Sequence, residues 1–235
     1  TTAAVCYRTT SNINGWGSAS ANELFARAIL RMGVPVSPRN IFPSNIQGLP
    51  TWYEVRVNEK GYIRRRGGVD FMVCVNPQSM AKDIQDVEPG GYLFYDNTKP
   101  LDLRLLRHDI QFIGVPLTDI CRQQYTDPRQ RQLFKNVIYV GALAALLDIE
   151  FKVLTDLIAD QFKSKEKLIV QNVHALELGY HYARDNFKCP LGVRLERRNN
   201  VGDKILIDGN TACGLGAERP GCAANCRPGP SCPIR

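Results

Sequence analysis

The run Val69–Val75 is almost entirely apolar, and it constrains the fold more than any other segment. A short apolar run of this kind is typical of a strand that is covered on both faces of a sheet. Asn76-Pro77 ends the run, and proline suits the first turn of the short helix that we expect up to about Val87. A strand followed directly by a helix indicates an α/β protein, in which helices cover a mostly parallel sheet.

Strand and helix patterns alternate along the rest of the chain. The other expected strands are Ala3–Thr9, Val34–Val36, Tyr53–Val57, Tyr62–Arg66, Tyr92–Tyr95 and Ile110–Val115. The other expected helices are Leu24–Met32, Val137–Leu147 within a helical region that starts near Arg129, Phe151–Phe162 and Lys165–Phe187. We predict a three-layer α/β fold with a mostly parallel sheet, an antiparallel hairpin made by Tyr53–Val57 and Tyr62–Arg66, and a helical C-terminal part.

Two of these helices have informative apolar patterns. Val137–Leu147 is apolar on nearly every side, which predicts a buried helix. Lys165–Phe187 has a narrower stripe, which predicts lengthwise packing on another helix of this chain or of a partner. The stripe consists of Ile169, Val173, Leu176, Tyr180, Ala183 and Phe187. Ser37–Pro50 contains three prolines but also several apolar residues, so we expect an ordered loop there.

The formal net charge of +7 favours anionic partners: a nucleic acid, a phosphorylated cofactor or an acidic protein. The basic residues are spread along the chain, and the only dense run is Arg64–Arg66. No aromatic residues alternate with this run to stack on bases, so we interpret it as a solvated strand end or a subunit contact. A phosphate-bearing ligand fits the sequence better than a nucleic acid does.

The sequence has no apolar run of the roughly 20 residues needed to cross a bilayer. Thr1–Arg8 lacks the charged start and apolar stretch of a signal peptide. The chain has no initiator Met, so we expect a processed or trimmed chain or a fragment. The expected location is the cytoplasm, with no membrane partner.

The eight cysteines fall into two groups. Cys6, Cys74, Cys121 and Cys189 are far apart and are expected to be small buried hydrophobic residues. Cys213, Cys222, Cys226 and Cys232 crowd the C-terminal end without forming a CxxC pair. A metal-binding protein that uses these terminal cysteines is therefore a weaker alternative, and no metal ligand is predicted.

Asn14-Gly15-Trp16-Gly17-Ser18 lies between an expected strand and an expected helix. The start of a helix offers free backbone N–H groups, and glycines let an anion approach closely. The segment is either a phosphate- or carboxylate-binding turn or a capped tight turn. It does not match a dinucleotide fingerprint, because Ser20 replaces the third glycine and no acidic residue follows Val36.

Other polar residues give weaker signals. Asp70 and Asp96 flank apolar strands, and Asp96 follows a carboxyl end, where open α/β sheets bind ligands. An aspartate at a strand end also commonly caps a turn. The histidines have no metal-ligand spacing, and no catalytic residue can be assigned.

Three longer runs resemble a known family. They are Asn14–Asn22 (NGWGSASAN), Arg31–Val36 (RMGVPV) and Phe42–Arg56 (FPSNIQGLPTWYEVR). Together with Asn76-Pro77, Glu88–Tyr92, Tyr95-Asp96 and Lys204–Thr211, they resemble the gamma domain of 2-oxoacid:ferredoxin oxidoreductases, in the subgroup that fuses gamma ahead of alpha. Trp16 stands where this family usually has a small residue.

The resemblance implies an enzyme complex in which a thiamine diphosphate carbanion attacks a 2-oxoacid and carbon dioxide leaves. Electrons then pass through iron–sulfur clusters to ferredoxin, and coenzyme A takes the acyl group. In the family, thiamine diphosphate and the clusters are held outside gamma, while gamma helps to bind coenzyme A. The implied partners are the alpha and beta subunits or domains, together with ferredoxin.

The same resemblance implies which residues of this chain face coenzyme A and the thiamine region. They are Asn14, Gly15, Gly17, Ser18, Ser20, Asn22, Pro43, Ser44, Asn45, Gln47 and Gly48. Arg56 is a further candidate for contact with a phosphate or a carboxylate.

The resemblance extends from about residue 12 to residue 217 and implies the domain organisation. Residues 1–205 form the gamma-type domain, residues 206–217 begin the linker to an alpha domain, and residues 218–235 are an atypical tail that we expect to be disordered. The alpha domain should begin near Ile207, so we expect a chain truncated before alpha and inactive on its own. The alternative is a free-standing, non-catalytic binding or scaffold domain of the same fold.

Overall fold

The computed structural model describes residues 5–11, 18–42, 50–62, 67–163, 165–207 and 209–217. The chain divides into two compact units after Gly202. The second unit contains one described helix, α7 (Gly209–Ala217). All further elements belong to the first unit.

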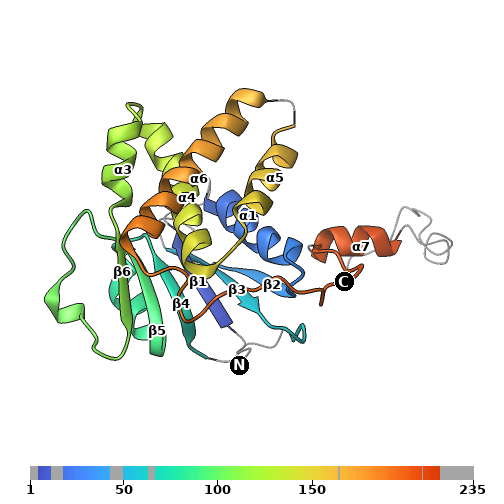
Figure 1. Ribbon diagram of the computed structural model, residues 1–235. Coiled ribbons are helices and arrows are strands. Elements are labelled where there is room, and N and C mark those ends of the chain that lie inside the picture. The colour runs from blue at the N-terminus through green and yellow to red at the C-terminus, as the bar shows by residue number, and fades with distance from the viewer. Residues whose placement is uncertain are drawn as a thin grey trace, which may run out of the picture. The chain divides into compact units, whose positions relative to one another are not determined.

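The first unit contains a six-stranded mixed sheet (Figure 1). Across the sheet, the strands are β2 (Val36–Ile41), β3 (Thr51–Val57), β1 (Val5–Ser11), β4 (Val69–Cys74), β5 (Val87–Asp96) and β6 (Gln111–Val115). β1, β4, β5 and β6 run parallel to one another, whereas β3 is antiparallel to both of its neighbours. The predicted α/β fold with a mostly parallel sheet and an antiparallel part is confirmed.

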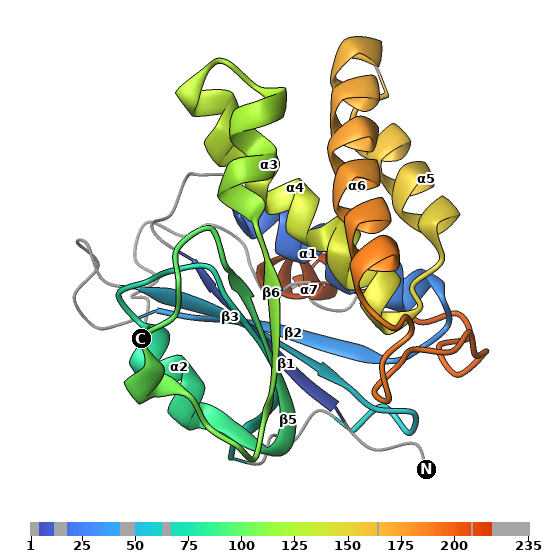
Figure 2. The same ribbon diagram turned by 60° about the vertical axis from the view of Figure 1, so that its left-hand side comes forward.

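Helices cover both faces of the sheet, as the three-layer prediction requires (Figure 2). One face carries α1 (Ser18–Arg31), α3 (Leu117–Gln124), α4 (Pro128–Leu147), α5 (Phe151–Gln161) and α6 (Glu166–Asn186). The other face carries α2 (Met80–Asp86), next to a loop with a single 3₁₀ turn at Leu103–Leu105.

The alternation of side chains along β4 explains why its sequence is continuously apolar. Phe71 and Val73 belong to the large core under α1 and α4, whereas Met72 and Cys74 belong to the smaller core under α2. All four side chains are buried, since each face of the strand has its own helical cover.

α4 and α6 pack closely along their lengths, which confirms that the stripe on α6 contacts a helix of this chain. A Cβ atom added to Gly141 would lie 2.0 Å from the carbonyl oxygen of Leu176. A Cβ atom added to Gly179 would lie 1.9 Å from the carbonyl oxygen of Ile138. The two glycines therefore allow the helix backbones to touch, and the Val137–Leu147 part of α4 is buried as predicted.

The antiparallel part of the sheet differs from the prediction. The second partner of β3 is β2, not a strand at Tyr62–Arg66; Tyr62 is irregular, and residues 63–66 lie outside the described residues. β2 also occupies part of the expected loop Ser37–Pro50. Pro38 fits there because β2 is an edge strand, where a missing N–H need not interrupt a ladder on both sides.

Two other boundaries shift. α1 begins at Ser18 rather than after Asn22, so Ser18, Ser20 and Asn22 lie in its first turns. β5 begins at Val87 and includes the Pro89-Gly90-Gly91 segment, which was expected to be a turn. The pairing of β5 with β4 shifts register at this point, so the segment is an irregularity within the strand.

Candidate functional site

The order of the strands defines where a ligand site is expected. From β1, helix α1 leads the chain towards β2 at one edge of the sheet. From the neighbouring strand β4, helix α2 leads it towards β5 and the opposite edge, over the other face of the sheet. The connections therefore diverge between the carboxyl ends of β1 and β4, and open α/β sheets bind ligands at such a point.

A pocket of about 680 Å³ lies at this edge of the sheet. The register pairs Thr10 of β1 with Cys74 of β4, and Cys74 with Tyr95 of β5, so the ends of these strands are level. The pocket is lined by residues that follow β4, β5 and β6 and by the first half of α4. Its volume is within the range of about 300–1,000 Å³ that is usual for small-ligand sites.

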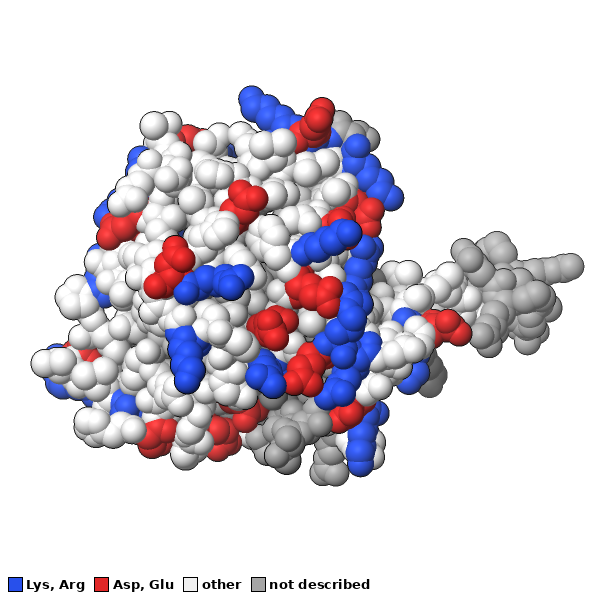
Figure 3. All heavy atoms as spheres, in the orientation of Figure 1, with Lys and Arg blue, Asp and Glu red and all other residues white. Residues whose placement is uncertain are grey.

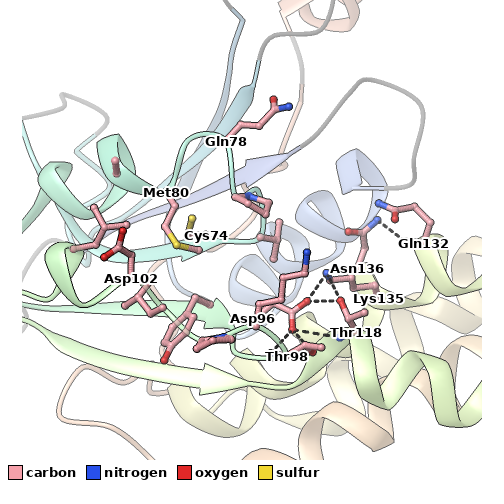
Figure 4. Close-up of a pocket in the computed structure, with 18 of the residues that line it drawn as sticks. Cys74, Gln78, Met80, Asp96, Thr98, Asp102, Thr118, Gln132, Lys135 and Asn136 are labelled. Carbon is pink, nitrogen blue, oxygen red and sulfur yellow. Dashed lines mark hydrogen bonds and ion pairs between the residues drawn. The ribbon is translucent and has the colours of Figure 1, made fainter.

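Asp96 is the centre of a hydrogen-bonded cluster on one side of the pocket (Figure 4). Its Oδ1 accepts hydrogen bonds from the hydroxyl and backbone N–H of Thr98, at 2.7 and 3.2 Å. Its Oδ2 accepts from the Thr118 hydroxyl and from Lys135 Nζ, each at 2.5 Å. Asp96 thereby joins the end of β5 to the start of α3 and to α4, and we call Asp96, Thr98, Thr118 and Lys135 the Asp96 cluster.

The electrostatics of the cluster favour an ionised Asp96. Burial alone would raise the pKa of Asp96, but the charge of Lys135 and the hydrogen bonds from Lys135, Thr118 and Thr98 outweigh it and lower the pKa. The side chains of Asp96 and Lys135 are only 13% and 20% exposed. The ion pair is therefore a fixed and largely desolvated part of the pocket wall.

Cys74 lines the pocket from the end of β4, but its thiol is protonated. Burial, the nearby charge of Asp83 and a hydrogen bond with Asp83 raise the pKa of Cys74. The thiol donates to the carbonyl oxygen of Asn76 at 3.5 Å. The expectation of buried cysteines is confirmed for Cys74 and Cys121, and Cys74 is not an activated nucleophile.

Asn22 is the best-defined member of the predicted site. It is 3% exposed, and its carboxamide oxygen accepts a hydrogen bond of 2.8 Å from the hydroxyl of Tyr139. Tyr139 lies one turn along α4 from Asn136, which lines the pocket. Asn22 therefore fastens the start of α1 to α4 beside the pocket, while Ser20 is exposed.

The structure separates Arg56 from the rest of the predicted set. Arg56 pairs with Cys6 near the amino end of β1, whereas Thr51 pairs with Ser11 at the carboxyl end. Five residues of a strand span about 16 Å, so Arg56 lies that far along β3 from the ligand edge. Its Nε donates to the carbonyl oxygen of Tyr62 at 3.1 Å.

The remaining predicted residues lie outside the described residues. They are Asn14, Gly15, Gly17, Pro43, Ser44, Asn45, Gln47 and Gly48. The backbone of Ser18 is described as the first residue of α1, but its side chain is not. The contribution of these residues to a site remains a prediction.

Sequence reasoning missed most of the residues that line the pocket. It placed Asp96 at a strand end, but it did not identify Lys135, Thr118 or Thr98 as partners. Thr98 and Thr118 were accessible to the argument, since each lies just beyond an expected strand and such ends meet at one edge of the sheet. Lys135 lies inside a helix, and no local pattern distinguishes it.

Other features limit the kinds of site in the described parts of the chain. There, no group of three or more His, Cys, Asp or Glu side chains could hold a metal ion, and no described helix is long and apolar enough to cross a membrane. On the face shown in Figure 3, acidic side chains lie among the basic ones. Arg31 pairs with Asp160, and Arg197 pairs with Glu150.

Solved structures share this fold. The chain is similar to a 2-oxoglutarate:ferredoxin oxidoreductase from Magnetococcus marinus, solved with 2-oxoglutarate, coenzyme A and succinyl-CoA bound, with a TM-score of 0.79, 22% identity, and coverage of 91% of this chain and 36% of that chain. It is similar to the gamma subunit of a keto/oxoacid ferredoxin oxidoreductase from Geobacter sulfurreducens, with a TM-score of 0.62 and 16% identity, over 77% and 99% of the two chains. At these identities the likeness shows the fold alone.

Sequence comparisons identify the family. The chain is 24% identical over 246 residues to the alpha subunit of a 2-oxoacid:ferredoxin oxidoreductase from Aeropyrum pernix, covering 86% of this chain and 38% of the relative. It is 29% identical over 122 residues to the ketoisovalerate oxidoreductase subunit VorA of Methanothermobacter thermautotrophicus, covering 52% and 24%. The chain thus spans less than half the length of these relatives. The family model described as pyruvate ferredoxin/flavodoxin oxidoreductase matches residues 9–182, so the chain belongs to this oxidoreductase family, as the sequence resemblance implied.

Proposed function

We propose that this chain is the gamma-type domain of a thiamine diphosphate-dependent 2-oxoacid:ferredoxin oxidoreductase. In this role it binds coenzyme A, which accepts the acyl group, and it contacts the alpha and beta parts of the complex. Thiamine diphosphate supplies the carbanion chemistry and iron–sulfur clusters carry the electrons to ferredoxin; both belong to the partner domains. The chain alone is inactive, and the complex works in the cytoplasm.

One observation supports the proposal most strongly: a pocket of about 680 Å³ lies beside the divergence of β1 and β4, at the carboxyl ends of β4 and β5. Asn14–Gly17 lies between β1 and α1 in the chain, and Ser18 is the first residue of α1. A phosphate at such a position meets glycine backbone and the N-terminus of a helix. A structural neighbour of the same family holds coenzyme A.

The gamma assignment has separate support from the coverage of the neighbours. The Geobacter gamma subunit aligns over 99% of its own chain, and the pyruvate oxidoreductase subunit PORC of Thermotoga maritima aligns over 96% with a TM-score of 0.59. Whole subunits of these complexes therefore correspond to a part of this chain. A domain of that kind positions a substrate for chemistry that cofactors perform.

Isothermal titration of the chain with coenzyme A, together with co-expression with a beta-type subunit of the family, tests the proposal. We expect saturable binding of coenzyme A and co-purification of the subunit. Free-standing chain with added thiamine diphosphate, 2-oxoacid and ferredoxin should show no turnover. Absence of both binding and co-purification would refute the proposal and favour a non-catalytic scaffold domain.

A further inference from the structure

The pocket has two chemically different walls (Figure 4). The wall formed by α4 carries an ammonium group and two carboxamides, from Lys135, Gln132 and Asn136. The wall formed by α2 and by the loop after β5 is mainly apolar and includes Met80, Leu101 and Leu105. A ligand that fills the pocket must therefore have hydrogen-bonding groups on one side and aliphatic groups on the other.

Most of the charges that line the pocket occur in ion pairs. Lys135 is neutralised by Asp96 at 2.5 Å. Arg122 pairs with Asp119 at 3.2 Å, and Asp102 pairs with Arg104 at 3.0 Å. Lys99 lines the pocket from an exposed position, where water screens its charge. The buried part of the pocket, around the Lys135–Asp96 pair, therefore offers hydrogen-bond donors without an excess of positive charge and suits an uncharged group better than a phosphate.

Lys135 has a hydrogen-bond donor left for a ligand. An ammonium group has three N–H donors, and two of them point to Asp96 Oδ2 and to Thr118 Oγ1, at 2.5 and 2.9 Å. Within the described parts of the chain, no acceptor is found for the third. Because Lys135 lines the pocket and the Asp96 cluster holds its side chain, the third N–H is a fixed donor for an acceptor such as an amide carbonyl.

We propose that this pocket binds the pantetheine arm of coenzyme A, with Lys135 donating to an amide carbonyl and the apolar wall covering the aliphatic part. The inference rests on the proposed function and assigns one part of that ligand to residues outside the predicted turn. Pantetheine is an uncharged chain with two amides and aliphatic groups, which matches both walls. The anionic phosphates of coenzyme A lie outside this pocket, and Asp96 and Thr118 act as positioning residues for Lys135.

Titrations with whole and divided ligands test the inference on the full chain. Coenzyme A, pantetheine and adenosine 3′,5′-bisphosphate are each titrated into the unaltered protein and three variants. Ala81→Trp places an indole in the pocket from an exposed position of α2. Gln85→Trp is the matched control, because Gln85 is exposed on the same helix and does not line the pocket. Lys135→Met removes the donor and keeps an unbranched side chain that is only one heavy atom shorter.

Under the inference, pantetheine binds the unaltered protein and Gln85→Trp but not Ala81→Trp. Lys135→Met weakens the affinity for coenzyme A roughly tenfold, the loss expected for one hydrogen bond to a charged donor. The affinity for adenosine 3′,5′-bisphosphate is the same in all four proteins. Thermal unfolding of each variant verifies that it is folded. If Lys135→Met does not fold, Ala81→Trp still tests whether the pocket binds pantetheine.

The outcomes separate the two proposals. If coenzyme A binds the unaltered protein and all three variants equally, and pantetheine binds none of these four proteins, the pocket assignment is wrong and the proposed function stands. If Ala81→Trp weakens adenosine 3′,5′-bisphosphate instead of pantetheine, the pocket holds the nucleotide and the assignment is likewise wrong. If no coenzyme A binds to the unaltered protein, the proposed function loses its main support and this inference fails with it.

Discussion

Replacing Asp96 with asparagine changes the Asp96 cluster in a way that can be worked out from its geometry. An amide has one oxygen and one NH₂ group, whereas both carboxylate oxygens accept hydrogen bonds here. If the NH₂ group takes the place of Oδ2, it faces the ammonium group of Lys135, which now lies 2.5 Å from that atom. If it takes the place of Oδ1, it faces the backbone N–H groups of Thr98 and Thr118, which now lie 3.2 and 3.4 Å away.

Either orientation leaves donors facing donors in a partly desolvated site. A hydrogen bond to a charged group contributes about 1.5–3 kcal/mol, and loss of one partner from a buried ion pair costs about 3–5 kcal/mol. Asp96 and Lys135 are 13% and 20% exposed, so some water still reaches them. We therefore expect Asp96→Asn to lower the free energy of unfolding by about 2–3 kcal/mol at pH 7.

Urea denaturation at several pH values measures this effect, and a double-mutant cycle with Lys135→Met apportions it. The double variant removes the ammonium group that the amide would face. The losses in free energy of unfolding of the two single variants, added together, should therefore exceed the loss in the double variant by about 1–2 kcal/mol. The pKa of Asp96 is lowered in the folded state. Its contribution is then fully present above the ordinary aspartate value of about 3.9 and is lost as the pH falls through the lowered folded value.

The difference between the unaltered protein and Asp96→Asn should therefore narrow only below about pH 4. A loss of less than about 0.5 kcal/mol at pH 7, the usual range of an ordinary surface substitution, would show that the cluster does not stabilise the pocket wall. A difference that stays constant down to acid pH would show that the ionised form of Asp96 is not the stabilising one.

Three further predictions concern the framework of the site. Gly179→Ala places a Cβ atom 1.9 Å from a carbonyl oxygen of α4, so α4 and α6 must separate. We expect urea denaturation to show a free energy of unfolding that is lower by about 2 kcal/mol or more. Gly214→Ala is the control, because nothing lies within 4 Å of the added Cβ atom in α7, and it should not destabilise the chain. Tyr139→Phe removes the hydroxyl that donates a 2.8 Å hydrogen bond to the buried oxygen of Asn22. In the same assay we expect the free energy of unfolding to fall by about 1–3 kcal/mol. Burial and a raised pKa protect Cys74, so mass spectrometry should find it unmodified by iodoacetamide until denaturant unfolds the chain.

The apolar patterns predicted those elements whose buried faces carry a regular run or stripe of apolar residues. β4 is apolar because both of its faces are covered, and α6 has a stripe because one of its sides contacts α4. β2 was missed over most of its length. It is an edge strand whose residues are intermediate or exposed, so neither a continuous nor an alternating apolar pattern marks it.

The candidate site was only partly predictable, because the sequence does not contain the order of the strands. Asp96 and Lys135 are 39 residues apart and belong to a strand and a helix. Their contact depends on β5 lying between β4 and β6 and on α3 returning the chain to α4. Once the order is known, the residues that follow each parallel strand can be collected, and Thr98 and Thr118 appear at once as neighbours of Asp96.

The sequence of the predicted turn and the lining of the pocket suit different parts of one ligand. Thr10 is level with Cys74, which is level with Tyr95, so the carboxyl ends of β1, β4 and β5 lie at one edge of the sheet. The segment after β1 contains Gly15 and Gly17, which suit an anion, whereas the pocket beyond β4 and β5 has carboxamides and the Lys135–Asp96 ion pair. Under the proposed function, a ligand with a phosphorylated end and an uncharged amide chain would suit both the sequence of the turn and the lining of the pocket, whereas a ligand with only one of these parts would suit only one of them.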